Sequence, residues 1–361
     1  MKLLTANVTL FPIQLKAPFK TALREVQSLD VVRVVLIWDN GIIGVGEAAP
    51  TPAITGDTQE KIIEDIEQLY VPFLIGKEIA DSLEQLTAMK QLVRGRTSAK
   101  AAIDIAIFDS LAKQQKQPLF RYLGGTTTTL ETDYTISINT PKQMVTDSLA
   151  KYQEGFTCLK VKMGLDDPAI EIEKLYAIHH ALNEKVQFRI DANQGWQPTE
   201  AIQIIEACRE LPIQFIEQPV KAHDISGLAY VTKRSLFPIM ADESLYDVAD
   251  AQRLIDEKAC DMFNIKLMKA GGIQGAIQIY QLANQHQIPC MIGSMIEGYV
   301  GLAAASHFAL GMSANFFIDL DVPFMWKPFE HMTEYTGMSF KKNQLTVQNK
   351  LGLGVEIGGS L

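Results

Sequence analysis

The sequence predicts an α/β protein: a (β/α)7β TIM-like barrel with an α+β N-terminal capping domain. From residue 133 onward, eight short β-rich runs alternate with helix-length segments at a pitch of roughly 25 residues, the pattern expected of parallel βα units. Eight such units imply a closed barrel. The first ~125 residues show no such period. We therefore place the capping domain at residues 1–125, joined by the C-terminal tail 326–361, and the barrel at 126–325.

The first part of the capping domain predicts a hairpin. Val31–Trp38 is rich in β-branched residues and is separated from Ile42–Val45 by Asp39-Asn40-Gly41. Asn-Gly between two such runs predicts a tight turn in which both residues adopt positive φ. The region is therefore expected to begin as a meandering sheet.

Helices are expected to follow this sheet. Asp57 followed by Glu60 predicts a helix start, and Ser98–Lys113 is rich in Ala and Ile at helical spacing. Gly124-Gly125 ends the region. The apolar face of the first helix comprises Ile62, Ile63, Ile66 and Leu69.

The barrel strands can be placed individually. They are expected at Tyr134–Ile138, Leu159–Met163, Phe188–Ala192, Phe215–Gln218, Ile239–Asp242, Phe263–Leu267, Cys290–Ser294 and Phe316–Asp321. The alternative, an open doubly wound sheet, would carry a Gly-rich dinucleotide loop after its first strand, where this chain has Ile136-Ser137-Ile138-Asn139-Thr140. After about Trp326 no further strand–helix unit is expected.

Composition excludes some partners. The net charge of −9 argues against a nucleic-acid-binding protein, because no basic run offsets repulsion by phosphates. No apolar stretch is long enough to span a bilayer, so no membrane partner is expected. The four cysteines have no C-x-x-C spacing, which favours free thiols and a cytoplasmic location. We further expect a homo-oligomer.

Three carboxylates stand at the ends of consecutive predicted strands: Asp191, Glu217 and Asp242. Active sites of such barrels lie at the C-terminal ends of the strands, and neighbouring strands are ~4.8 Å apart, so these side chains can converge. A divalent cation would remove their mutual repulsion, and all-oxygen ligands favour one Mg²⁺ per chain over zinc. Any one of them alone would more simply cap a helix or pair with a lysine.

Lysines lie on both sides of these acids in the predicted barrel. Lys160 and Lys162 share one face of the second strand, and the sixth strand carries Lys266. A metal and neighbouring ammonium groups favour a neutral amine, which can act as a base. Lys162 and Lys266 on opposite faces of one carbon could remove and return a proton, as a racemase or epimerase requires. The alternative is that the lysines only neutralise the acids.

Asp319 and Asp321 share a face of the eighth predicted strand. Two acids that point into the barrel, away from the metal strands, suggest a ligand with a cationic group such as an ammonium. A helix cap and a surface acid explain them equally well at this stage.

The ordered set of motifs at the strand ends resembles the muconate lactonizing enzyme subgroup of the enolase superfamily. The motifs are Lys-x-Lys, Asp-Ala-Asn, Glu-Gln-Pro, Asp-Glu-Ser and Asn-Ile-Lys. The resemblance implies Lys or His bases with Mg²⁺ that stabilises an ene-diolate. The Asp-x-Asp of strand eight is similar to that of dipeptide epimerases, where it holds the α-ammonium of the substrate.

Further segments resemble the L-Ala-D/L-Glu epimerases: Phe19–Arg24, Ile54–Asp57 and Gly293–Glu297. This resemblance implies that Arg24 contacts the glutamate side chain, that Thr135 and Ser294 line the substrate pocket, and that the dipeptide is the small-molecule partner. It also implies a role in peptidoglycan recycling.

The expected reaction is a 1,1-proton transfer. Mg²⁺ and Lys160 would bind the carboxylate and stabilise the ene-diolate, while Lys162 and Lys266 act as the acid/base pair. Other activities of the subgroup remain as alternatives, namely N-acylamino-acid racemisation, o-succinylbenzoate synthesis and cycloisomerisation. Asp319 and Asp321 argue against these. A non-catalytic Mg²⁺- or ligand-binding barrel is the last alternative.

Overall fold

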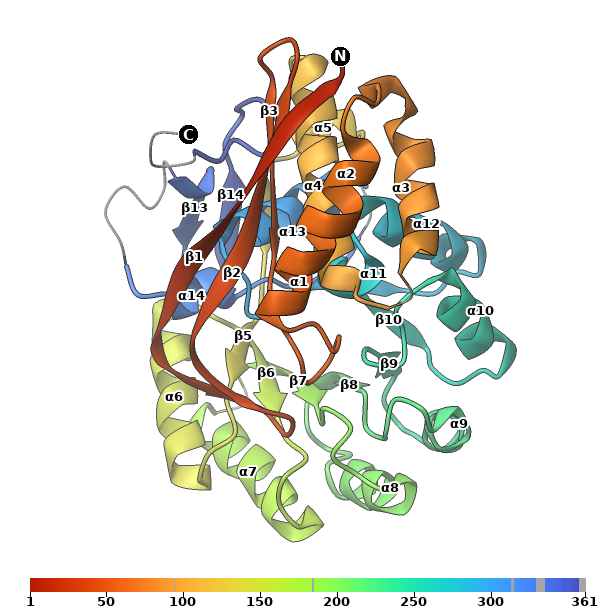
Figure 1. Ribbon diagram of the computed structural model, residues 1–361. Helices are drawn as coiled ribbons and strands as arrows, with labels where there is room; N and C mark the ends of the chain where they lie inside the picture. Colours follow the sequence, from red (N-terminus) through yellow and green to blue (C-terminus); the bar gives the residue numbers. More distant parts are fainter. Residues whose placement is uncertain (94, 184, 313–314, 329–334, 357–361) are drawn as a thin grey trace.

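A parallel eight-stranded sheet forms the centre of the protein (Figure 1). The computed structural model describes residues 1–361 apart from 94, 184, 313–314, 329–334 and 357–361. Each strand pairs with the next in the chain, in the order β12-β11-β10-β9-β8-β7-β6-β5. The bounds are β5 Tyr134–Ile136, β6 Cys158–Lys162, β7 Gln187–Asp191, β8 Ile213–Glu217, β9 Ile239–Ala241, β10 Met262–Ile265, β11 Cys290–Gly293 and β12 Phe317–Asp319. All eight predicted strands are confirmed.

The sheet closes almost completely into a barrel. Among the described strands no ladder joins β12 to β5, but the backbone N–H of Asp133 donates to the carbonyl of Ile318 across the gap at 3.4 Å. The side chain of Thr132 also accepts from the backbone N–H of Leu320 at 2.9 Å. Strand one and strand eight therefore lie side by side, as the prediction of a barrel requires.

Helices follow the barrel strands and cover their outer surface (Figure 1). Three of them begin with proline, whose missing N–H costs nothing in the first turn. The bounds are α6 Pro141–Glu154, α7 Pro168–Ala181, α8 Pro198–Ala207, α9 Ile225–Thr232, α10 Val248–Asp256, α11 Leu267–Ala270, α12 Ile273–Gln285, α13 Tyr299–Gly311 and α14 Val322–Met325.

The N-terminal region forms an antiparallel sheet backed by helices. Its strands are β1 Leu3–Lys20, β2 Glu25–Trp38 and β3 Ile43–Ala48, and its helices are α1 Gln59–Asp65, the π-helical turn Ile66–Tyr70, α2 Val71–Leu74, the 3₁₀ turn Ile79–Asp81, α3 Ser82–Leu92, α4 Thr97–Gln114 and α5 Leu119–Tyr122. A Cβ at Gly46 would lie 1.8 Å from the carbonyl oxygen of Ala102. Glycine in β3 thus lets α4 pack directly on the sheet.

The predicted hairpin exists, but its turn differs from the prediction. Only Gly41 has positive φ (81°), and Asn40 does not. The backbone N–H of Gly41 donates to the carbonyl of Trp38 at 3.0 Å. This is a type I turn followed by a left-handed residue, which forms a longer loop than the two-residue turn expected from Asn-Gly.

The start of α1 also differs from the prediction. Thr58 is the N-cap, and its hydroxyl accepts from the backbone N–H of Lys61. The carboxylate of Asp57 instead accepts from the backbone N–H of Ser98 at 2.9 Å, at the start of α4. Asp57 therefore joins the 50–57 loop to α4 and does not begin α1.

The tail returns to both parts of the molecule. Its strands β13 (Met338–Lys341) and β14 (Gln344–Val347) form a three-stranded sheet with β4 (Thr129–Glu131). A bridge pairs Leu15 with Trp326, and the N–H of Leu119 donates to Gly352. The domain boundaries at 125 and 325 stay predictions.

The four cysteines are free thiols. None of the helices in the described part of the chain combines the length and the apolar character that crossing a membrane requires.

Candidate active site

The three acids predicted to bind metal converge. Asp191 and Glu217 are the last residues of β7 and β8, and they are direct partners in the ladder. Asp242 follows β9. All three are fully buried, and one oxygen from each lies within 4.8 Å of the others. The parallel register therefore brings them to one point, as the sequence predicted.

The backbone around this cluster adopts uncommon conformations that place its side chains. Gln218 has φ of 36° and Asn193 has φ of 42°. The side-chain oxygen of Gln218 accepts from the backbone N–H of Asp242 at 3.0 Å, and the N–H of Asn193 donates to Asp191 at 2.9 Å. Left-handed non-glycine residues cost free energy and occur preferentially at functional sites. Here they follow directly after two acid-bearing strands.

The lysines contact the same carboxylates. Lys162 Nζ lies 2.5 Å from Asp191 Oδ2, and Lys266 Nζ lies 2.7 Å from Asp242 Oδ2. Lys160 Nζ lies 2.7 Å from Glu217 Oε2. Lys162 and Lys266 therefore stand at opposite ends of the cluster, on the sides that the order of the strands predicted.

Burial and neighbouring charge shift the pKa values in this cluster. Burial lowers the pKa of Lys160, but Asp319, Glu217 and Asp191 outweigh it and raise that pKa well above its usual value. Burial likewise lowers the pKa of Lys266, and Asp242 and Glu217 raise it further than burial lowers it. The carboxylates therefore favour the ammonium form of both lysines. The neutral amine that a bound metal favours stays a prediction.

The pKa values of the acids shift in different directions. Burial, followed by the charge of Asp191, raises the pKa of Glu217 to about 8. The pKa of Asp242 is lowered, because Lys266 and Lys269 outweigh its burial. Of the three acids, Glu217 is thus the one whose ionised form the lysines stabilise least.

The donor set fits a hard divalent cation. Two carboxylate oxygens in it, Glu217 Oε2 and Asp242 Oδ1, are buried and make ion contacts but no hydrogen bond of normal geometry with any described residue. A Mg²⁺ ion prefers carboxylate oxygens and would supply the missing partner. It would also offset the negative charge of Asp191, which adds to burial in raising the pKa of Glu217.

A second group of acids lies where β12 meets β5. Asp319, Asp321 and Asp133 are all buried, and one oxygen from each lies within 4.8 Å of the others. Lys160 Nζ lies 2.6 Å from Asp319, and Arg189 lies 2.8 Å from Asp133. Three acids with two cations leave room for one more positive charge.

The acids of this second group also differ in their pKa values. Burial, with the charge of Asp319 next, raises the pKa of Asp321 to about 7. The backbone N–H of Thr135 donates to Asp321 Oδ2 at 2.5 Å, which places Thr135 directly against this carboxylate. Asp321 is thus buried, which rules out the surface acid of the alternative interpretation.

Arg24 lies in the same cavity as these residues. The cavity has a volume of about 40 Å³ and is lined by Arg24, Thr135, Lys160, Lys162, Lys266, Ser294, Asp319 and Asp321, among others. Burial lowers the pKa of Arg24 to about 10. Within the described part of the chain no carboxylate pairs with its guanidinium. The predicted substrate contacts therefore gather around one space.

Three polar residues of the site were not predicted. Asn264 donates to Glu217 at 2.8 Å, Lys269 lies 2.6 Å from Asp242 Oδ1, and Asp133 joins the second acid group. Asn264 is the first residue of the Asn-Ile-Lys motif and shares a strand face with Lys266, so the period of two could have assigned it to the site. Asp133 and Lys269 lie outside the strand ends, where no pattern marks them.

Comparisons with known proteins agree with this geometry. Residues 5–124 match the mandelate racemase/muconate lactonizing enzyme N-terminal domain, and residues 144–360 match the enolase C-terminal domain-like family. The chain belongs to the enolase superfamily. The predicted resemblance and barrel are thereby confirmed.

Individual relatives of this superfamily member cover its whole length. It is 39% identical to the L-Ala-D/L-Glu epimerase of Bacillus subtilis (strain 168), over 100% of this chain and 98% of the relative. A substrate-liganded structure of the L-Ala-D/L-Glu epimerase from that organism superposes with a TM-score of 0.95 over 100% of both chains, at 39% identity. A dipeptide epimerase from Enterococcus faecalis V583, complexed with Mg and L-Leu-L-Tyr, superposes with a TM-score of 0.92 at 35% identity over 98% of this chain and 99% of the other.

Proposed function

We propose that the protein is a Mg²⁺-dependent dipeptide epimerase that transfers the α-proton of the C-terminal residue, with L-Ala-D/L-Glu as its substrate. One observation supports this most directly. Lys162 and Lys266 stand at opposite ends of the Asp191–Glu217–Asp242 cluster and line one cavity. A non-catalytic metal site has no use for two such bases.

The acid cluster has the role of holding the cofactor. Asp191, Glu217 and Asp242 would bind one Mg²⁺, which when bound supplies electrophilic stabilisation to the carboxylate of the substrate. Lys160, beside Glu217, adds a second positive charge where the ene-diolate develops its own negative charge. The likeness to a structure complexed with Mg supports this assignment.

The two lysines divide the proton transfer. A cation bound to the carboxylates would neutralise the negative charges that raise the pKa of Lys266. Either Lys162 or Lys266 can then act as a neutral base. One Nζ removes the α-proton from its face, and the other donates a proton to the opposite face. Configuration at the α-carbon is thereby inverted.

The two ends of the dipeptide have separate partners. The α-ammonium would complete the group of Asp319, Asp321 and Asp133, which holds three acids against two cations. The glutamate side chain would pair with Arg24, whose half-buried side chain lines the same cavity. Ser294, which follows β11, lines the cavity and is proposed to contact the substrate. Substrates without a free ammonium fit this arrangement less well.

A dipeptide panel tests the proposal. With Mg²⁺ present, L-Ala-L-Glu is expected to be epimerised faster than N-acetyl-L-glutamate, which lacks the ammonium. Loss of configuration can be followed by polarimetry. Turnover of the N-acylated substrate alone would favour N-acylamino-acid racemisation and would contradict the assignment of Asp319 and Asp321.

A cytoplasmic location and a homo-oligomeric state stay predictions. The four free thiols support the first.

A further inference from the structure

Residues 294–298 connect β11 to α13 and form one wall of the site. Three of them line its cavity: Ser294, Met295 and Ile296. The segment begins beside Lys266, because a Cβ on Gly293, the last residue of β11, would come within 3.1 Å of Lys266 Cε. A contact that fixes this segment therefore also fixes the surroundings of Lys266.

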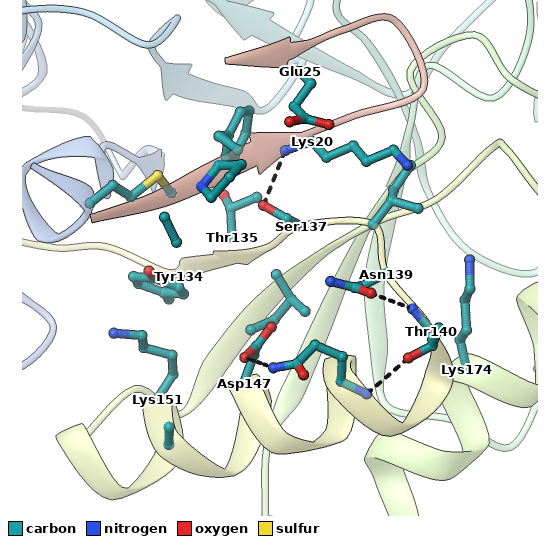
Figure 2. A pocket seen from close by; sticks show the side chains of 18 of the residues that line it. Lys20, Glu25, Tyr134, Thr135, Ser137, Asn139, Thr140, Asp147, Lys151 and Lys174 are labelled. Carbon is teal, nitrogen blue, oxygen red and sulfur yellow. Dashed lines mark hydrogen bonds between the residues drawn. The ribbon is translucent and has the colours of Figure 1, made fainter. Parts of the chain in front are cut away.

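The side of the site next to Lys162 has a different character. Lys162 Nζ lies 6.0 Å from the centre of the Phe19 ring, and Phe19 also lines a neighbouring cavity of about 930 Å³. Figure 2 shows Lys20 and Glu25 on one side of that cavity and Asp147 and Lys151 on the other. Lys162 is therefore close to open space, whereas Lys266 is next to a segment of buried residues.

A buried carboxyl group, that of Glu297, fixes this segment from within. Glu297 Oε1 accepts from the backbone N–H of Met295 at 2.9 Å, which closes a tight turn directly after Ser294. Glu297 Oε2 is buried and has no hydrogen-bond partner among the residues that the structure describes. Glu297 does not line the cavity. Its side chain therefore acts on the backbone of the wall and not on a ligand.

A second buried acid, Glu47 of β3, joins this segment to the capping domain. Glu47 Oε1 accepts from the backbone N–H of Gly301, in the first turn of α13, at 3.3 Å. The N-cap of α13 is Gly298, which has no side chain, and a Cβ there would lie 2.3 Å from Glu47 Oε1. Glu47 thus supplies the cap that α13 lacks, and an acid is favourable at a helix N-terminus.

Arg33 of β2 holds Glu47 in this position. A guanidinium nitrogen of Arg33 lies 3.4 Å from Glu47 Oε2. The guanidinium also lies over the rings of Phe11 and Tyr299, at 4.2 and 4.5 Å from their centroids. Tyr299 is the first residue of α13. The capping domain therefore grips the start of α13 through an ion pair and an aromatic contact.

Glu297 and Glu47 approach the same point of α13. A Cβ on Gly301 would lie 2.6 Å from Glu297 Oε2 and 3.5 Å from Glu47 Oε1. Burial, with the charge of Glu47 in addition, raises the pKa of Glu297 to about 8, and Lys266 acts in the opposite direction. Glu297 is therefore mostly protonated near pH 7, and it holds the segment by hydrogen bonding without adding a second negative charge.

We propose that Glu297 is a positioning residue for the Lys266 side of the active site, where it holds residues 294–298 against the helix start that Glu47 anchors. The proposal rests on the proposed two-base epimerase activity. Loss of the Glu297 carboxyl group lets the wall beside Lys266 shift, while the surroundings of Lys162 keep their shape. A misplacement of about 1 Å can cost on the order of a hundredfold in rate, so one of the two proton transfers is affected selectively.

The test measures each lysine by itself. Lys162→Met leaves Lys266 as the base, and Lys266→Met leaves Lys162. Exchange of the α-proton in deuterated water is followed with Mg²⁺ and with whichever isomer, L-Ala-L-Glu or L-Ala-D-Glu, each variant exchanges. Adding Glu297→Ala should lower exchange at least about tenfold in the Lys162→Met protein and less than about threefold in the Lys266→Met protein.

Three further changes separate positioning from folding. Glu297→Gln keeps a neutral group with an oxygen that can accept from Met295, and it should restore exchange by Lys266. Gly301→Ala keeps Glu297 but puts a Cβ against its Oε2, and it should lower the same exchange. Asp109→Asn is the matched control: this buried acid of the capping domain contacts β3 and the tail, so its change should lower stability without altering the ratio of the two exchange rates.

An equal fall in both backgrounds, or a fall in neither, would overturn the positioning role and leave the two-base activity intact. If Glu297→Ala does not fold, the same comparison with Gly301→Ala decides. No exchange by either single lysine variant would overturn the proposed function, and the positioning role with it.

Discussion

Replacing Arg24 with Met isolates the contact proposed to select glutamate. The change removes the guanidinium and keeps most of the apolar stem. The backbone of Arg24 is held independently, since its carbonyl accepts from Thr21 at 2.9 Å and its N–H donates to the Thr21 hydroxyl at 3.3 Å. The loop should therefore keep its shape in the variant.

The size of the effect follows from the partial burial of the Arg24 side chain. Burial lowers the pKa of Arg24 to about 10, and among the described residues it has no acid partner. A carboxylate that pairs with it forms a charge-assisted contact worth about 1.5–3 kcal/mol, or roughly ten- to more than a hundredfold in an equilibrium constant. We expect Arg24→Met to lower kcat/KM for L-Ala-L-Glu by about that factor.

The assay compares this substrate with L-Ala-L-Leu, which has no side-chain carboxylate. Arg24→Met should spare L-Ala-L-Leu or improve its turnover, and Arg209→Met, at an exposed position, serves as a control. An equal loss on both substrates would mean that Arg24 shapes the loop without contacting the side chain. No loss on either would mean that it never reaches the substrate.

Three other expectations concern the metal, the ammonium group and acid stability. Dialysis against EDTA should abolish epimerisation and Mg²⁺ should restore it, because the converging ligands are all carboxylates; full turnover without metal would contradict this. Asp321→Asn should weaken binding of a free-amine dipeptide in calorimetry while Mg²⁺ affinity stays nearly constant, and unchanged dipeptide binding would return Asp321 to a structural role. His307 is buried, and desolvation lowers its pKa to about 3, below its unfolded value. The unfolded state thus binds its proton first as pH falls from 6.5, which should cost about 2 kcal/mol of stability between about pH 7 and pH 5. Urea unfolding should show that His307→Gln loses less stability than the wild-type protein over this pH range, by that amount. An identical loss of stability in both proteins would refute the assignment.

The barrel could be predicted because each of its strands is a short β-rich run, and the chain order of the runs equals their order in the sheet. Local details were less accessible. Asp57 and Thr58 are both good N-caps, and the choice between them depends on Ser98, which lies 41 residues away. The turn at Gly41 was misjudged because Asn-Gly also fits a longer loop.

The acids and lysines of the site could be predicted because parallel register brings the ends of neighbouring strands together. Asp133 could not, since its place depends on Arg189, an ion-pair partner from another strand. The pKa of Lys266 in this structure was not predictable for a similar reason. Its pKa depends on the balance between burial and two carboxylates, which no sequence pattern shows.

The two-base mechanism is tested most directly by α-proton exchange in deuterated water. With Mg²⁺ and L-Ala-L-Glu, the wild-type enzyme should interconvert the isomers and place deuterium at the α-carbon of the glutamate. Lys162→Met and Lys266→Met should each abolish interconversion, while the remaining lysine still exchanges the α-proton of one isomer, a different isomer for each variant. Interconversion at a near wild-type rate in either variant would contradict the account.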